Sequence, residues 1–137
     1  MTVVADTGAL YALADKDDAW HGRVLRWWQD APRTVTVPAV VLPEVTYLLA
    51  TRIGPAAELA FVKSLADGEL LVETLEVEDI IRVAILLREY ADLPLGFVDA
   101  AVVAALERLG THELLTTDRR HFSVVRPRHV RTLTLLP

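Results

Sequence analysis

The chain has 137 residues, of which 53% are hydrophobic and 24% charged, so it can bury a sizeable core and is not a disordered chain. It contains no cysteine, which excludes disulfides, thiolate metal sites and a cysteine nucleophile. No apolar run approaches the roughly 18 residues of a membrane span, and the first residues resemble a strand more than a signal peptide. We therefore expect a single cytoplasmic domain over residues 1–137 that contacts no membrane.

The net charge of −5 is unevenly distributed. Residues 119–137 contain five arginines and no acid, so the rest of the chain is strongly acidic. This distribution excludes a uniformly basic nucleic-acid binder. Two interpretations of the arginine-rich segment stay open. It is either a basic edge beside an acidic centre, which would suit a phosphodiester substrate held near metal ions, or an ordinary solvated surface.

The N-terminal stretch TVVADTGAL predicts a strand, a polar junction and a helix. Residues 3–5 have the length and branching of a strand buried on both faces, as in the middle of a parallel sheet. Asp6 falls where that strand would end, Thr7 is a good N-cap, and Gly8 allows a close approach of backbone or ligand. A carboxylate at the carboxyl end of a central strand lies where open α/β sheets bind ligands.

The rest of the chain alternates between helical and extended patterns. The apolar periodicity, prolines and glycines predict helices over residues 9–14, 19–30, 39–52, 56–66, 77–90 and 97–109, a turn of helix through 122, and strands over 34–37, 70–72, 114–116 and 132–135. Pro32 should end the second helix. Strands separated by helices throughout predict an α/β fold, with a parallel sheet and helices on both faces.

Two helices carry apolar faces in this pattern. The helix over 19–30 places Trp20, Val24, Trp27 and Trp28 on one side, which we interpret as core, with a partner-binding groove as the alternative. The helix over 77–90 has apolar residues at helical spacing, namely Ile80, Val83, Ala84 and Leu87.

Four acids occupy corresponding places in these elements. Asp6, Glu44 and Asp118 lie at or just after predicted strand ends, and Asp99 falls in the first turn of a helix. Oxygen ligands suit hard cations such as Mg²⁺ or Mn²⁺, and carboxylates brought together repel one another unless a cation or shared protons are present. One or two such ions would activate water and stabilise the leaving oxygen of a phosphodiester.

A simpler interpretation exists for each acid alone, because an acidic residue at a helix start commonly caps the helix. The four positions together favour a site. The hydroxyls of Thr7, Thr116 and Thr117 would orient the carboxylates or the water.

Four segments, in this order and with these separations, make the chain resemble the PIN-domain nucleases, in particular the VapC-type toxins of bacterial toxin–antitoxin modules. They are VVADTGALYALADKDDAWH, VLPEVTYLL, YADLPLGFVDAAVVAALERLG and LLTTDRRHF. The resemblance implies a PIN-like three-layer α/β domain, with a five-stranded parallel sheet flanked by helices. It also implies Mg²⁺- or Mn²⁺-dependent cleavage of RNA, with Asp6, Glu44, Asp99 and Asp118 as the catalytic, metal-binding quartet.

The same resemblance assigns supporting roles and partners. Thr7 and Thr116 would be the supporting hydroxyls. Relatives usually form homodimers and are held inactive by a small antitoxin protein whose tail occupies a groove beside the site. On this hypothesis RNA crosses the carboxyl edge of the sheet, where Arg119 and Arg120 contact its phosphates.

The sequence departs from the family pattern at two places. It has His121 where many relatives have Asp three residues after the fourth acid, and Gly96 where relatives often carry Asp before the third acid. His121 would approach a phosphate or a metal-bound water, or would be a surface residue near a helix end.

Two alternatives to an RNA-cleaving toxin stay open. The first is a housekeeping RNA-processing nuclease of the same fold. The second is a non-catalytic protein-binding module, either a degenerate nuclease or a receiver-like domain. A receiver would need an acidic neighbour beside Asp6 and a lysine in the last strand, and the sequence has neither.

Overall fold

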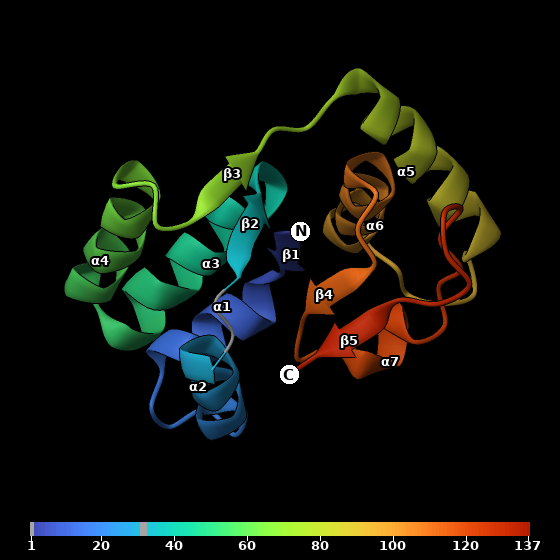
Figure 1. Ribbon diagram of the computed structural model, residues 1–137. Coiled ribbons are helices and arrows are strands. Elements are labelled where there is room, and N and C mark those ends of the chain that lie inside the picture. Colours follow the sequence, from blue (N-terminus) through green and yellow to red (C-terminus); the bar gives the residue numbers. More distant parts are fainter. Residues whose placement is uncertain (1, 31–32) are drawn as a thin grey trace.

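A computed structural model describes residues 2–30 and 33–137, and its centre is a five-stranded sheet (Figure 1). All pairings between neighbouring strands are parallel, and the strand order is β3-β2-β1-β4-β5. This confirms the predicted α/β fold with a five-stranded parallel sheet. The strands are β1 (Thr2–Ala5), β2 (Thr34–Pro38), β3 (Leu71–Glu73), β4 (Glu113–Leu115) and β5 (Thr134–Leu136).

The helices follow the predicted order, and their ends fall within two residues of the predicted ones. They are α1 (Thr7–Ala14), α2 (His21–Asp30), α3 (Leu42–Leu48), α4 (Pro55–Ala66), α5 (Val77–Glu89), α6 (Phe97–Leu109) and α7 (Arg119–Phe122). A 3₁₀ turn over Ala39–Val41 precedes α3 and a π turn over Leu49–Ile53 follows it, so the predicted helix over 39–52 consists of three consecutive helical segments. Pro32, predicted to end the second helix, lies outside the described residues.

The central strand β1 passes directly into α1, and this junction corrects one prediction. Asp6, not Thr7, is the N-cap of α1: its backbone is extended, and its side chain accepts the Ala9 N–H at 3.2 Å. The cap is the last extended residue before a helix, and here that residue is the one that ends the strand. Thr7 is therefore the first residue of α1, and its hydroxyl donates to Glu44 instead.

The hydrophobic core surrounds β1 and α6. Val3, Val4 and Ala5 are fully buried, as expected for a strand with a neighbour on each side and helices over both faces. Helix α6 buries residues 100–106 on all sides, so its N-terminal turn, which carries Asp99, is held in a fixed place at the carboxyl edge of the sheet.

A network of ion pairs attaches α6 to α5 and β3. The Arg108 guanidinium donates to Asp79 at 3.0 Å and to Glu73 at 2.6 Å, and Arg82 donates to Glu107 at 2.8 Å. Asp79 is only 2% exposed, so its charge depends on Arg108 for compensation.

This network explains why the predicted apolar face of α5 is partly wrong. The buried apolar residues are Val83 and Leu86, whereas Ile80 is 47% exposed. The face toward α6 also contains Asp79 and Arg82, which a pattern of apolar residues cannot reveal. Within the described residues, no helix combines the length and the apolar character that crossing a membrane requires.

Candidate metal centre

Three segments that are distant in the sequence meet at the carboxyl edge of the sheet. Asp6 follows β1, and Thr116 follows the adjacent strand β4. Asp118 is the N-cap of the short helix α7, and Asp99 lies in the first turn of α6. In open α/β sheets this edge is where ligands bind.

Asp6 is the most buried of these carboxyl groups, with 8% of its surface exposed. It accepts the Ala9 N–H with Oδ1 and the Thr116 hydroxyl with Oδ2, the latter at 2.5 Å. Burial raises the pKa of Asp6 from 3.8 to about 6, and the negative charges of Asp118 and Asp99 add to the rise against the opposing hydrogen bonds. The site therefore disfavours a negative charge on Asp6 unless a cation is present.

Both oxygens of Asp118 contact a single residue, His121. Oδ1 accepts the His121 backbone N–H at 3.1 Å, which caps α7, and Oδ2 lies 2.7 Å from Nδ1 of the imidazole. The Asp118 N–H in turn donates to Thr116 Oγ1 at 2.9 Å. His121 is therefore part of the site, and its interpretation as a surface residue is wrong.

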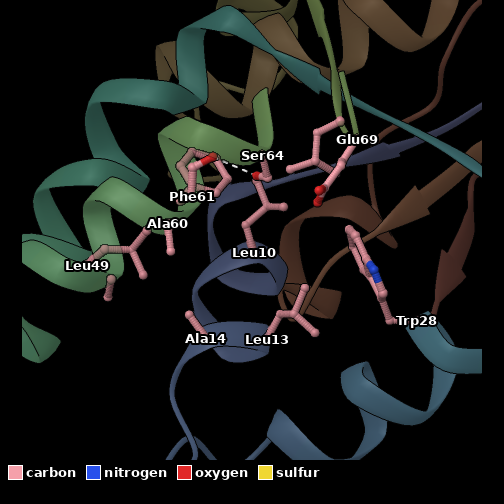
Figure 2. A pocket seen from close by; sticks show the side chains of 11 residues that line it. Leu10, Leu13, Ala14, Trp28, Leu49, Ala60, Phe61, Ser64 and Glu69 are labelled. Carbon is pink, nitrogen blue, oxygen red and sulfur yellow. Dashed lines mark hydrogen bonds between the residues drawn. The ribbon is translucent and has the colours of Figure 1, made fainter. Parts of the chain in front are cut away.

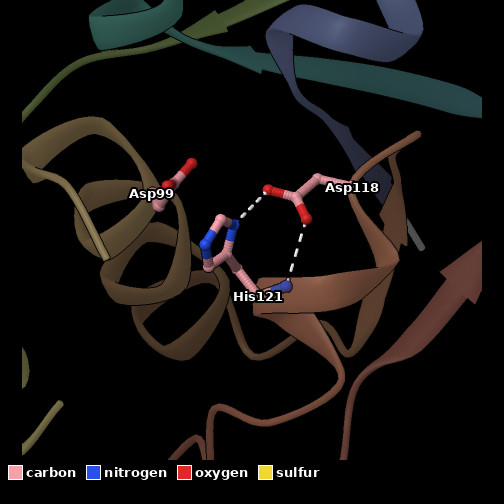
Figure 3. A group of neighbouring side chains, drawn as sticks. All are labelled: Asp99, Asp118 and His121. Atoms are coloured by element: carbon pink, nitrogen blue, oxygen red, sulfur yellow. Dashed lines mark hydrogen bonds and ion pairs between the residues drawn. The ribbon is translucent and has the colours of Figure 1, made fainter. Parts of the chain in front are cut away.

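Asp99 completes a compact group with these two residues (Figure 3). Asp99, Asp118 and His121 each offer one ligand atom, and these atoms lie within 4.8 Å of one another. Asp99 is half-buried, and its pKa is raised, first by desolvation and then by the charge on Asp118, with a smaller contribution from Glu44.

Glu44 lies in the first turn of α3 and is the most exposed of the four predicted acids. Its Oε1 accepts the Thr7 hydroxyl at 2.7 Å. Glu44 is not one of the group within 4.8 Å, and it acts on that group through its charge. The structure thus brings Asp99 and Asp118 together, places the more buried Asp6 within reach of their charges, and leaves Glu44 accessible to solvent.

Gly8 is required where α1 passes the segment after β4. A Cβ at this position would lie 2.3 Å from Thr117 Oγ1, which is far inside van der Waals contact. The predicted close approach at Gly8 is therefore an approach of Thr117.

The two arginines proposed to contact phosphates differ in their surroundings. Arg119 donates to the Pro137 carbonyl oxygen at 2.7 Å, and its guanidinium carbon lies 5.5 Å from the centre of the Trp20 ring. Arg120 is exposed and has no ion pair within the described part of the chain. Arg120 is the freer of the two to meet a phosphate.

An apolar cleft of about 410 Å³ lies between α1, α2 and α4 (Figure 2). Leu10 and Leu13 line it from α1, Trp28 from α2, and Ala60 and Phe61 from α4. Trp27 and Trp28 pack against the core, which confirms the core interpretation for these two residues, and Trp28 also borders the open cleft.

The donor set fits a divalent cation. Carboxylate oxygens are ligands of Mg²⁺ and Mn²⁺, and an imidazole nitrogen is a ligand of transition-metal ions. The mutual repulsion that raises the pKa values of Asp6 and Asp99 is the repulsion that a bound cation relieves. Nε2 of His121 is buried and has no hydrogen-bond partner among the described residues, so one potential ligand atom is unused.

Comparison with known proteins places this geometry in one family. A family model described as the PIN domain matches residues 3–126. The chain is 35% identical to ribonuclease VapC26 of Mycobacterium tuberculosis over 135 residues, covering 98% of this chain and 100% of that protein. Its structure is similar to that of VapC20 of M. tuberculosis, described as a toxin that cleaves the sarcin–ricin loop, with a TM-score of 0.79, 26% identity, and 94% and 98% of the two chains covered. A complex of VapBC2 from Rickettsia felis with promoter DNA contains a chain of the same fold, at a TM-score of 0.72, 14% identity and full coverage of both chains.

Proposed function

The chain belongs to the PIN-domain family, and on that premise we propose that it is a metal-dependent endoribonuclease acting as the toxin of a toxin–antitoxin module. The observation that carries this proposal is the convergence of Asp6, Asp99 and Asp118 from three separate segments on one edge of the sheet. An isolated helix cap needs no such convergence. The proposed cofactor is Mg²⁺ or Mn²⁺.

Each residue of the site has a role in this proposal. Asp6, Asp99 and Asp118 would hold the cation, which when bound supplies an activated water and neutralises charge on the phosphodiester. Thr116 fixes the Asp6 carboxylate by its hydrogen bond, and the burial of Asp6 keeps bulk water away from that carboxylate. Glu44, oriented by the Thr7 hydroxyl, is the acid that incoming substrate and solvent reach first.

The proposed substrate is RNA whose backbone lies along the carboxyl edge of the sheet. Arg120, which is exposed in α7, would contact a phosphate there, while Arg119 is hydrogen-bonded to the carbonyl oxygen of Pro137. Because a relative of the same fold at 26% identity is a sarcin–ricin loop cleaving toxin, a hairpin RNA with that loop is the first substrate to test.

Cleavage of that hairpin by purified protein tests the proposal. We expect cleavage with Mn²⁺ or Mg²⁺, its loss on addition of EDTA, and its loss in Asp99→Asn. Asp92→Asn is the matched control, since Asp92 is exposed in the loop before α6 and outside the site. Equal cleavage of total RNA or the hairpin by the Asp99 variant and the parent would refute the assignment.

The proposed protein partner is a small antitoxin, as the family resemblance implies. The cleft between α1, α2 and α4 is open and apolar, which suits an apolar segment of such a partner. Docking there would place the partner on the two helices that follow β1 and on α4.

We also propose that the free protein forms a homodimer. Helix α5 exposes four large apolar side chains, namely Val77, Ile80, Ile81 and Ile85. Clustered apolar exposure of this kind marks association surfaces more often than it occurs on monomers.

The alternative of a housekeeping nuclease shares the whole site and differs only in partner. A degenerate, non-catalytic module is not favoured, because Asp6, Glu44, Asp118 and both supporting hydroxyls are hydrogen-bonded in the structure and Asp99 lies close to Asp118.

A further inference from the structure

We propose that His121 is a metal ligand through Nε2, so that this chain has a mixed nitrogen and oxygen site where a purely carboxylate site would otherwise stand. The inference rests on the proposed function, because it concerns the same centre, and it deepens that function by assigning a residue and a metal preference. It starts from the contacts of the imidazole ring.

The ring is held in a defined orientation by Asp118. Nδ1 lies 2.7 Å from Asp118 Oδ2, and the backbone N–H of His121 donates to Asp118 Oδ1 at 3.1 Å. Two hydrogen bonds from one residue to both oxygens of one carboxylate leave the ring little freedom to rotate. Figure 3 shows the imidazole between the Asp118 and Asp99 carboxylates.

This orientation also selects the tautomer of the neutral ring. An ionised carboxylate only accepts hydrogen bonds, so the proton of the neutral ring belongs on Nδ1. Nε2 then carries a lone pair. A histidine that donates one ring N–H to a carboxylate and uses the other nitrogen on a metal is the usual arrangement of metal-ligating histidines.

The lone pair on Nε2 accepts no hydrogen bond from the described residues. Nε2 is buried and has no hydrogen-bond partner among the described residues, although a buried polar atom without one is costly. In Figure 3, Nε2 lies on the side of the ring that faces α6, the helix that carries Asp99. A cation between Asp99 and His121 would give Nε2 a partner. It would also relieve the repulsion between the carboxylates.

The positions permit an ion shared by Asp99 and His121. One ligand atom of each of Asp99, Asp118 and His121 lies within 4.8 Å of the others, and because Asp118 Oδ2 holds Nδ1, Asp99 is the carboxylate that would share the ion on Nε2. Two ligands on one ion, each at about 2.1 Å, lie up to about 4.2 Å apart, so small side-chain adjustments suffice.

An imidazole ligand changes which cation is preferred. Mg²⁺ favours oxygen ligands, whereas Mn²⁺ and the later transition metals accept imidazole with increasing affinity. We therefore expect this site to favour Mn²⁺ over Mg²⁺ by more than an all-carboxylate site would, and to favour Co²⁺ over Mg²⁺ by a larger factor still.

Pulsed electron paramagnetic resonance of the purified protein with less than one equivalent of Mn²⁺ tests the ligand directly. We expect modulation from a directly bound ¹⁴N in the parent protein and its loss in His121→Gln, with His112→Gln as the control because His112 precedes β4 outside the site. Calorimetric titration should show the ratio of Mn²⁺ to Mg²⁺ affinity falling by about tenfold in His121→Gln and His121→Asp.

Three results separate the inference from the function on which it rests. Mn²⁺ bound by the parent without ¹⁴N modulation overturns the role of His121 and leaves the proposed nuclease intact. An unchanged affinity ratio in His121→Gln does the same. A parent protein that binds no Mn²⁺ at millimolar concentration overturns both. The spectrum of the parent needs no variant, so the test holds even where a substitution impairs folding.

Discussion

The Thr116 hydroxyl donates to Asp6 Oδ2 at 2.5 Å, which joins the residue after β4 to the residue after β1. Thr116 Oγ1 also accepts the Asp118 N–H at 2.9 Å. Thr116 is fully buried, so one hydroxyl positions two of the proposed metal ligands without contacting solvent.

Replacing Thr116 by valine should weaken metal binding. The isosteric change removes the hydrogen bond that lowers the pKa of Asp6, so that pKa should rise further and the affinity for Mn²⁺ should fall by about tenfold or more. It also leaves the Asp118 N–H without its acceptor, at a cost of about 1–2 kcal/mol in the free energy of unfolding. Calorimetric titration and urea unfolding measure the two effects. Thr116→Ser should restore both, and equal Mn²⁺ affinity in all three proteins would contradict this role.

The stability of the metal-free protein should depend on pH through Asp6. The pKa of Asp6 is about 6 in the folded protein and 3.8 in the reference state, so between these values the folded state binds more protons than the unfolded state. This contribution to the free energy of unfolding therefore falls as pH rises from about 4 to above 6, by about 3 kcal/mol in total.

Asp6→Asn removes the titration of Asp6, so the difference between variant and parent reports its contribution. In EDTA, the variant should gain about 1 kcal/mol or more relative to the parent between about pH 5 and about pH 7.5. Urea unfolding at the two pH values gives the difference. A constant difference between the variant and the parent would mean that the Asp6 carboxyl titrates normally.

Arg108→Met should destabilise the fold by about 3 kcal/mol. The change leaves the Asp79 carboxylate, which is 2% exposed, without its guanidinium partner and removes the link from α6 to Glu73 on β3. Arg88→Met on the exposed side of α5 is the control and should change little. Thermal or urea unfolding measures the stability of both variants. An equal loss of stability in the two would contradict the role of this network in holding α6.

Ala60→Arg should abolish binding of an antitoxin encoded beside the gene. The new side chain would place a charge in the apolar cleft, where Ala60 is one of the lining residues. Ala56→Arg, on the same helix outside the cleft, is the matched control. Co-purification of the tagged antitoxin with each variant is the measurement. Undiminished capture by Ala60→Arg would place the antitoxin elsewhere.

Ile81→Glu should convert a homodimer into a monomer. Ile81 is 61% exposed on α5, among the other exposed apolar residues of that helix. Leu59→Glu changes a 68% exposed residue on α4 and should leave the dimer unchanged. Light scattering after size-exclusion chromatography gives the mass of each protein, and a monomeric parent would remove the basis for the proposed dimer.

The spacing of apolar residues and the positions of prolines and glycines predicted most of the fold. The short, branched apolar run of residues 3–5 predicted a strand buried on both faces, and Gly110 predicted the end of α6, where it adopts the left-handed conformation that glycine favours. The face of α5 was less predictable, because Asp79 and Arg82 are buried by partners on other elements.

For the candidate site, the sequence was sufficient to predict which acids lie at the carboxyl edge of the sheet. The sequence left the cap of α1 open between Asp6 and Thr7, because both are good caps by residue type and only the end of the strand decides between them. His121 was undervalued although it lies three residues after Asp118, a spacing that returns a side chain to the cap of a short helix. No local pattern indicates that its Nε2 is left without a partner, since that depends on α6.

The most direct test of the account is a crystal structure of the protein with Mn²⁺, with the ion located by its anomalous scattering. We expect a peak at the carboxyl edge of the sheet, within coordination distance of Asp99 and Asp118 and adjoining Asp6. An ordered peak elsewhere, or a carboxyl edge without one in a protein that cleaves RNA, would contradict it.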